Sequence, residues 1–369
     1  MLIAGLIVLI VCFTLLIAVI FKRLVMNKNQ WIIFGIVLIS GLVMVTFGIV
    51  PPEEWDLYRH YELLEDMNRG GWDYIVSESI YTHLPIVNFL YAIVSVTEVY
   101  QLLPCLVVII CYSIALYLLK DTMREGKKGD SWFVAFAIIF NMALCPFLHM
   151  VSGVRNILAY AICALIFYLD IYEKINKILI YILYLATIFI HPSSIIVCCI
   201  RILIPILLKW KWLNVFVVMW SLVTDMLVII LLKIPIAFIQ SIGWKLEDYL
   251  NNLEFSGHKM LLIKLFFLGS LLLLVEFYKK AMKLGKQDVL YRYLSSFQVV
   301  ILFILGAFRV QFIADRLCYF IAFTAFPVLF CIYKGKETKV KYIFYIESIC
   351  VFALLFIYQF LYFSTDLIG

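Results

Sequence analysis

Residues 178–208 read ILIYILYLATIFIHPSSIIVCCIRILIPILL, and this run is long enough for one tilted membrane helix or for two short ones. A helix needs about 20 mostly apolar residues to cross a bilayer. The choice sets the sidedness of every later segment. It depends on where the basic residues fall, because Lys and Arg concentrate in cytoplasmic loops.

Apolar runs of this kind recur along the whole chain. Of its 369 residues, 65% are hydrophobic and 15% are charged, and the mean hydropathy is +1.05, unlike a soluble domain. We therefore predict an all-α, polytopic membrane bundle of about 12 spans, with residues 1–369 forming a single transmembrane domain. The predicted spans are 2–21, 31–50, 100–119, 131–149, 156–172, 178–190, 192–208, 212–232, 260–278, 293–308, 317–333 and 342–362.

Loop charge orients these spans. Two short helices that meet at His191 and Pro192 leave 20 of the 30 basic residues on one side, which is then the cytoplasm. A single span over 178–208 would instead turn the cluster from Lys279 to Lys286 outward. Both termini are therefore expected outside, and the first apolar run lacks the basic n-region of a cleaved signal peptide.

Two outer segments are long. Residues 51–99 carry eight acidic residues before Tyr81; Asp56 is suited to cap a helix there, and the apolar stretch 83–96 is too short to span. Residues 233–259 suit an interfacial helix. The ten cysteines lie in or beside apolar runs without zinc-site spacing, so we interpret them as small core residues.

The stretch HMVSGVRNILAYAI, residues 149–162, places a cation where a span begins. If Ser152 is the N-cap, Arg155 is at position N3, where the helix dipole disfavours a cation by roughly 0.3 to 1 kcal/mol. Free N–H groups and a guanidinium together suit a phosphate or pyrophosphate. The alternative is that Arg155 simply extends to lipid headgroups. His149 is a weaker candidate in the same stretch.

A second outer turn, FRVQFIADRLCYF at residues 308–320, supplies Arg309, Asp315 and Arg316. Asp315 can neutralise one of the two arginines, which leaves the other for a ligand. Within the spans, Arg201 and Asp225 fall on consecutive helices. A structural ion pair, or extension of Arg201 to the interface, explains them without a functional role.

Two positions are candidates for proton transfer. His191 lies where two short helices meet, a place where irregular backbone needs protein or a wet cavity around it, and its ring can take a proton; a hydrogen-bonded packing role is the alternative. In EEWDLYRHY, Asp56 and Tyr58 can form a carboxylate and aromatic edge with Arg59 beside them. A plain N-cap role for Asp56 is equally consistent.

These observations favour a lipid-facing site for a phosphorylated substrate outside the cytoplasm. The chain has no nucleotide motif and no set of metal ligands, so we expect no cofactor, no metal and no nucleic-acid partner. Chemistry with an already activated, lipid-carried donor and transport of an anion both remain open.

The order of the motifs resembles the EpsG-like, Wzy-type polysaccharide polymerases of bacterial envelopes. The likeness covers about residues 50–330, and its motifs are DLYRHY, THLPIVNFLYAI, SGVRNILAYAI, IFIHPSSII and DRLCYF. The chain departs from the family pattern twice. Leu84 and Pro85 stand where a Glu-Pro pair is common, so no acidic role carries over, and Asn156 stands where glutamine is common.

The resemblance implies a GT-C-like bundle in the bacterial cytoplasmic membrane that joins oligosaccharide repeats linked to undecaprenyl pyrophosphate, with membrane lipids around it and a flippase and a chain-length regulator as pathway partners. Arg155 and Arg316 would clamp the pyrophosphate. Secondary contacts would come from Arg59, Tyr58, Arg309, Asn156 and His149. His191 or Asp56 would deprotonate the acceptor hydroxyl.

Two other classes stay open from the residues alone. A flippase for lipid-linked oligosaccharides also needs cations for pyrophosphate, although it would show repeated halves and charges along a full path. An envelope O-acyltransferase would use its histidine from the cytosolic side, which disagrees with an outward His191.

Overall fold

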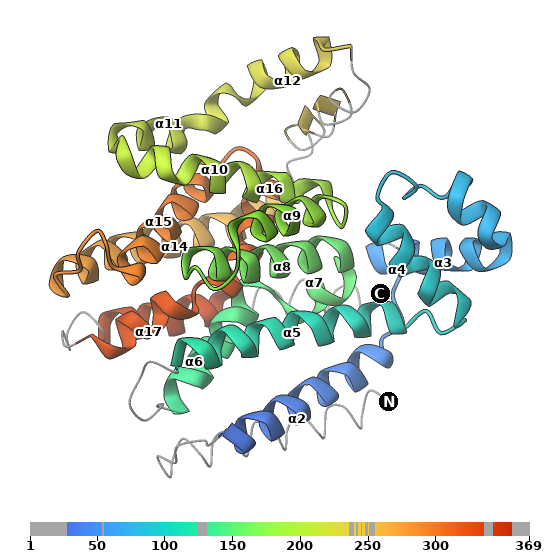
Figure 1. Ribbon diagram of the computed structural model, residues 1–369, viewed down its shortest axis with the longest axis horizontal. Coiled ribbons are helices and arrows are strands. Elements are labelled where there is room, and N and C mark those ends of the chain that lie inside the picture. Colours follow the sequence, from blue (N-terminus) through green and yellow to red (C-terminus); the bar gives the residue numbers. More distant parts are fainter. Residues whose placement is uncertain are drawn as a thin grey trace. The chain divides into compact units, whose positions relative to one another are not determined.

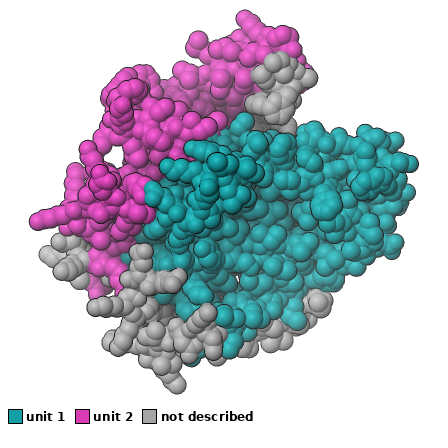
Figure 2. All heavy atoms as spheres, in the orientation of Figure 1, with its two compact units in different colours: residues 1–198, 322–330 teal, residues 199–321, 331–369 magenta. Residues whose placement is uncertain are grey.

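The computed structural model describes residues 28–53, 55–123, 131–235, 255–335 and 342–355, with a few positions between 240 and 250. Every regular element in these residues is a helix (Figure 1). The chain forms two compact units, shown in separate colours in Figure 2. Unit 1 holds residues 1–198 and 322–330, and unit 2 holds residues 199–321 and 331–369.

The prediction of a polytopic helical membrane protein is confirmed. Seven described helices are long and apolar enough to cross a bilayer, and a bent pair makes an eighth if it counts as one span. The seven are Gln30–Phe47, Leu102–Met123, Val154–Ile171, Pro192–Lys209, Lys211–Lys233, Leu261–Ala281 and Val289–Gly306. Shorter apolar helices are Pro85–Val96, Phe133–Leu144, Lys177–Ile188 and Tyr342–Leu355. The total of about 12 spans stays a prediction, and span 2–21 lies outside the described residues.

The break predicted at His191 is present. Helix α9 (Lys177–Ile188) starts at the N-cap Asn176, whose side chain accepts a 2.8 Å hydrogen bond from the Ile178 N–H. The 3₁₀ turn η2 (Pro192–Ser194) then leads into α10 (Ile195–Lys209). The first part of α10 returns against α9, since the Cys198 Sγ lies 3.6 Å from the Tyr184 carbonyl oxygen.

Two predicted spans are interrupted. The run 131–149 divides into α6 (Ser131–Leu144) and the short α7 (Phe147–Ser152), with Pro146 between them. The run 317–333 divides into α16 (Gln311–Thr324) and α17 (Phe326–Lys334), bent by 55°. Pro327 lies in the first turn of α17. A proline has no N–H for the preceding turn and crowds its carbonyl, so a helix restarts there more readily than it continues.

In unit 1, helix α5 (Leu102–Met123) packs against both α2 (Lys28–Phe47) and α8 (Val154–Ile171) (Figure 1). It also contacts α4 (Pro85–Val96) and α7. The buried alanines of α8, Ala159, Ala161 and Ala164, let neighbouring backbones approach closely. At the C-terminal end of α8, the Tyr168 hydroxyl donates a 2.5 Å hydrogen bond to Asp121, which also pairs with Lys174. These contacts fix α8 to α5.

The segment 51–99, which was predicted to lie outside, is built from α3 (Asp56–Asp73), the π turn η1 (Tyr74–Glu78) and α4 (Pro85–Val96). The break in α3 falls at Gly71, whose φ of +62° suits a residue without Cβ. Asn88 of α4 donates a 2.7 Å hydrogen bond to the Ile75 carbonyl and so ties α4 to η1. With 12 residues, α4 is about 18 Å long, too short to span, as predicted.

Unit 2 is described by α11 (Asn214–Met219), α12 (Thr224–Lys233), α14 (Phe255–Ala281), α15 (Val289–Gly306), and parts of α10, α16 and α17. Helix α15 packs against α14 and α11. The Trp220 indole donates a 3.1 Å hydrogen bond to the Phe303 carbonyl. Phe267 of α14 stacks on Phe344 at 6.2 Å between ring centroids. The interfacial helix predicted within 233–259 lies mostly outside the described residues.

Six of the nine described cysteines are buried, which confirms for them the interpretation as small core residues. The prediction is wrong for Cys199 and Cys350, which are exposed. Both lie on helices, on faces that the packing within the described residues leaves open, and apolar periodicity alone does not distinguish such a face from a buried one in a membrane protein.

Gly306, at the end of α15, is a position where packing requires the absence of a side chain. A Cβ there would lie 2.2 Å from the Val217 carbonyl oxygen and 2.6 Å from the Trp220 ring. We predict that Gly306→Ala lowers the free energy of unfolding by about 1 to 3 kcal/mol, because backbone atoms of α11 must move. The thermal midpoint of the purified protein in detergent measures this.

Gly269→Ala is the matched control, since a Cβ added at this helical glycine of α14 meets nothing within 4 Å. It should leave the midpoint unchanged or raise it. Equal midpoints for the two variants would contradict the close approach of α11 and α15.

Candidate functional site

Arg155 lies at the second position of α8, directly after the joint between α7 and α8. The N-cap of α8 is Gly153, which also ends α7. The prediction that Ser152 caps the helix is wrong, because Ser152 is still the last residue of α7 and no side chain caps α8. The Gly153 N–H donates a 2.7 Å bond to the carbonyl of half-buried His149, and a Cβ at this glycine would approach that carbonyl to 3.0 Å.

The guanidinium of Arg155 lies over an aromatic ring and is incompletely paired. Its Cζ is 4.2 Å from the centroid of Tyr81, a cation–π distance. Its Nε is buried and has no hydrogen-bond partner among the described residues. A buried N–H without an acceptor costs about 1 to 3 kcal/mol. An anion at this point would satisfy both the donor and the charge.

A wall of three aromatic side chains lies beside this guanidinium. Tyr91 of α4 is fully buried and contacts two rings edge to face, that of Tyr81 at 5.3 Å and that of His60 at 5.6 Å. Tyr81 comes from the segment before α4, and His60 comes from α3. Helices α3, α4 and α8 therefore supply one cluster, which we call the Arg155 cluster: His60, Tyr81, Tyr91 and Arg155.

His60, Tyr81 and Tyr91 were not among the site residues predicted from the sequence. The signal for His60 was present in DLYRHYELL, because residues 57, 60 and 64 share one helix face and the outer two are leucines. The structure buries Leu57, His60 and Leu64 together. His60 was overlooked as a candidate site residue because the prediction followed charged residues, and His60 lies on an otherwise apolar helix face.

The acidic and basic residues at the start of α3 form a pair at the edge of this cluster. Arg59 forms an ion pair with Asp56, and both side chains are more than half exposed. The predicted N-cap role of Asp56 is wrong, because Trp55 is the N-cap and Asp56 is the first helical residue, where a carboxylate still favours the helix dipole. Tyr58, one residue before Arg59, is half-buried.

The charges of Arg155, Arg59 and Asp56 change the pKa values of the cluster residues Tyr81 and His60. Burial raises the pKa of Tyr81, while the nearby Arg155 and Arg59 oppose that rise and Asp56 adds to it. Burial lowers the pKa of His60 to about 3, with a further contribution from Arg155 and Arg59. His60 is therefore neutral at physiological pH, and the region keeps its positive charge on the two arginines.

A second group of polar side chains lies where α8 meets the turn at His191. His191 is the N-cap of η2, and its Nδ1 accepts a 3.1 Å hydrogen bond from the Ser193 N–H and lies 2.7 Å from the Ser193 Oγ. The Tyr160 hydroxyl of α8 donates to the Ser193 carbonyl at 3.1 Å. The Oδ1 of Asn156, one turn before Tyr160, is buried without a partner among the described residues.

In unit 2, Asp315 and Arg309 have different partners from those expected. Asp315 accepts a 2.6 Å hydrogen bond from Lys264, a buried side chain of α14 that sequence reasoning did not consider. Arg309 pairs with Asp225 at 3.0 Å. Asp225 therefore neutralises Arg309, whereas Asp315 was predicted to neutralise one of the two arginines of this turn. Arg316 is half-buried and also makes a contact of its own.

Seven of the nine predicted site residues, namely Asp56, Tyr58, Arg59, His149, Arg155, Asn156 and His191, belong to unit 1, and the structure brings Arg155, Arg59 and Asp56 around Tyr81. Arg309 and Arg316 belong to unit 2. Within the described residues, no group of three His, Cys, Asp or Glu side chains is arranged to hold a metal ion.

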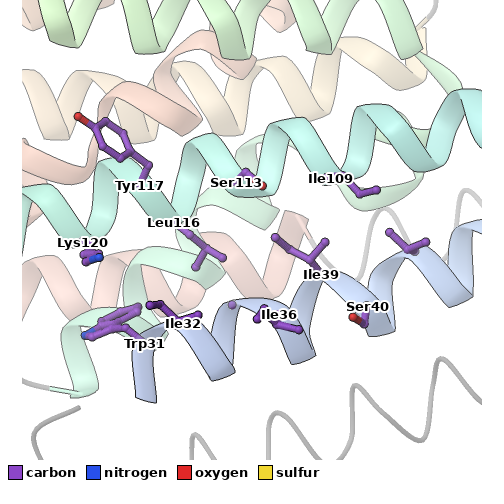
Figure 3. Close-up of a pocket in the computed structure, with 12 residues that line it drawn as sticks. Trp31, Ile32, Ile36, Ile39, Ser40, Ile109, Ser113, Leu116, Tyr117 and Lys120 are labelled. Atoms are coloured by element: carbon purple, nitrogen blue, oxygen red, sulfur yellow. The ribbon is translucent and has the colours of Figure 1, made fainter. Parts of the chain in front are cut away.

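A pocket of about 550 Å³ lies elsewhere in unit 1, between α2 and α5 (Figure 3). Its lining is apolar apart from Trp31, Ser40, Ser113, Tyr117 and Lys120. None of the predicted site residues and none of the Arg155 cluster lines it. Its chemistry suits a hydrocarbon chain better than a phosphate group.

Comparison with known proteins places the chain in one protein family. The model of the EpsG family matches residues 31–368, nearly the whole chain. No curated protein and no solved structure matches the chain.

The buried His60 should make stability depend on pH. Below about pH 6.5 the unfolded chain binds a proton at this residue, whereas the folded chain does so only near its lowered pKa of about 3. The free energy of unfolding should therefore fall as pH drops below 6.5, by up to about 1.4 kcal/mol per pH unit from this group. His60→Gln should flatten that dependence in unfolding measurements between about pH 7.5 and 5.5.

His83→Gln, which changes an exposed histidine, is the matched control and should keep the wild-type slope. If His60→Gln also keeps it, then the ring of His60 is not excluded from protonation by the fold.

Proposed function

This chain belongs to the EpsG family, and from that membership and the Arg155 cluster we propose that it is a membrane polysaccharide polymerase. It joins oligosaccharide repeats carried on undecaprenyl pyrophosphate at the outer face of the bacterial cytoplasmic membrane. The distribution of basic residues supports this orientation, with both termini outside. Membrane lipids surround it, and a flippase and a chain-length regulator act in the same pathway.

The observation that carries the proposal is the buried, unpartnered Nε of Arg155 above the Tyr81 ring. A guanidinium offers two parallel donors, which suits the paired oxygens of a phosphate. The aromatic wall under it lowers the local dielectric, so the attraction for an anion exceeds that at a solvated surface. Pyrophosphate is the anion that a lipid-linked glycan carries.

The reaction needs no nucleotide, because the donor is already activated. An acceptor sugar hydroxyl attacks the anomeric carbon of the donor glycan, and a new C–O bond forms. The bond between that carbon and the pyrophosphate oxygen breaks, and the oxygen leaves with the electron pair. The hydroxyl proton passes to a base on the protein. Negative charge grows on the leaving pyrophosphate, and fixed cations stabilise it in the transition state.

Arg155 binds the pyrophosphate, and the family resemblance offers Arg316 as the second cation for it. Arg59 and Arg309 contribute secondary charge, although Arg59 shares its charge with Asp56 and Arg309 with Asp225. Tyr58, His149 and Asn156 contact the glycan, and His191 or Asp56 takes the acceptor proton.

We predict that Arg155→Ala abolishes polymerisation without blocking export. In a host deleted for this protein, surface polysaccharide from cells that express Arg155→Ala should collapse from a ladder to a single repeat unit. The expected loss is about 10²-fold or more in polymer, as for removal of a transition-state charge contact. Arg155→Lys should restore only short ladders, because an ammonium lacks the planar fork. Gel analysis at matched protein level measures both.

Arg69→Ala is the matched control, since Arg69 is an exposed arginine of α3 paired with Glu65. It should give the wild-type ladder. Loss of all surface units in Arg155→Ala cells would indicate a flippase, and a normal ladder with altered mass would indicate an acyltransferase. Either result would contradict the polymerase proposal.

A further inference from the structure

The first turn of α8 presents two adjacent side chains in different directions. Arg155 faces Tyr81, and Asn156 is the next residue, about 100° further around the helix. Tyr160 lies four residues after Asn156 and therefore on the same face, one turn later. Because Tyr160 donates to Ser193, this face of α8 is the one that meets the His191 turn.

Asn156 brings an unused acceptor to that face. Its Oδ1 is buried and has no hydrogen-bond partner among the described residues. A carbonyl oxygen accepts up to two hydrogen bonds. A buried carbonyl oxygen that accepts none lowers the stability of the protein. A ligand that donates a hydrogen bond would remove this cost, whereas an anion would be repelled. The polarity at Asn156 is thus opposite to that at Arg155.

The contacts of His191 fix the position of its ring proton. The Ser193 N–H can only donate, so the Nδ1 that it contacts at 3.1 Å must offer a lone pair. In a neutral imidazole the proton is then on Nε2. That nitrogen is a donor, and the single lone pair of the ring is already used by the cap. A proton added at Nδ1 would break the turn that joins α9 to α10.

We propose that Asn156 and the His191 turn form a subsite for a sugar hydroxyl, in which Asn156 Oδ1 accepts a hydrogen bond and His191 supplies a donor instead of a base. This inference rests on the proposed function. It sets a hydroxyl-binding face beside the anion-binding face of the same helix turn, which fits a substrate in which a sugar is joined directly to pyrophosphate. Proton transfer from the acceptor then belongs to Asp56.

The test compares substitutions that keep or remove the donor. A glutamine amide carries an N–H donor but cannot accept a proton at neutral pH. In membrane vesicles from the host, with their own lipid-linked repeats as substrate, His191→Gln should polymerise within about threefold of the wild-type rate and His191→Ala about 10-fold or more slowly. Asn156→Leu, which keeps a similar size and removes the acceptor, should fall about 10-fold.

The pH profile separates a donor from a base. If His191 is a donor, the rate between about pH 5.5 and 8 should have the same shape in the wild type and in His191→Gln. If it is the base, His191→Gln should lose about 10² to 10⁴ in rate, as much as His191→Ala, and this inference is wrong. His83→Gln, at an exposed position, controls for loss of a histidine, and thermal midpoints in detergent control for folding.

The two proposals fail in different ways. Polymerisation that persists in vesicles from the deletion strain would overturn the proposed function and this inference with it. Polymerisation that needs the chain and Arg155, but is lost in His191→Gln, would overturn only the donor role. Asn156→Leu at the wild-type rate would overturn the hydroxyl subsite.

Discussion

The contact between the Arg155 guanidinium and the Tyr81 ring connects helix α8 of unit 1 to the segment 51–99. Helix α8 is held at its C-terminal end by Asp121, Tyr168 and Lys174. At its N-terminal end, about 20 Å away by the helical rise, it meets side chains from α3 and α4. Since Tyr81 also packs on Tyr91, and Tyr91 on His60, the cation at the start of α8 adjoins a cluster of side chains from α3, α4 and the stretch between them.

Within the described residues, the fold neutralises several of the charges that were considered as site candidates. Lys264 with Asp315 and Arg309 with Asp225 are ion pairs inside unit 2. Arg59 with Asp56 is an exposed pair at the edge of the cluster. Arg155 differs from these three pairs because its Nε remains buried without an acceptor. A buried charge without a full set of partners is expensive in a membrane protein, so such a residue marks function more strongly than a paired one.

Local signals predicted some helix breaks and missed others for a definable reason. The break at His191 was found because a proline coincided with a change in loop charge. Pro146 and Pro327 carry the same backbone constraint, but each lies inside an apolar run with no charge to mark a boundary, and the bends at these positions were missed. The cap of α8 was assigned to Ser152 because serine is a strong N-cap residue, whereas a short preceding helix had already used that residue.

The sequence by itself determined that the chain is a polytopic helical membrane protein, that short helices interrupt its bundle near His191 and within 51–99, and that Arg155 is a cation at the start of a span. These properties depend on the length and composition of continuous segments, which a sequence states directly. Only the tertiary structure decided which charges are neutralised and which histidine is buried beside Arg155. Asp315 and Lys264 are 51 positions apart, and Arg309 and Asp225 are 84 apart. Such pairs form through packing between distant helices, and no local pattern encodes them.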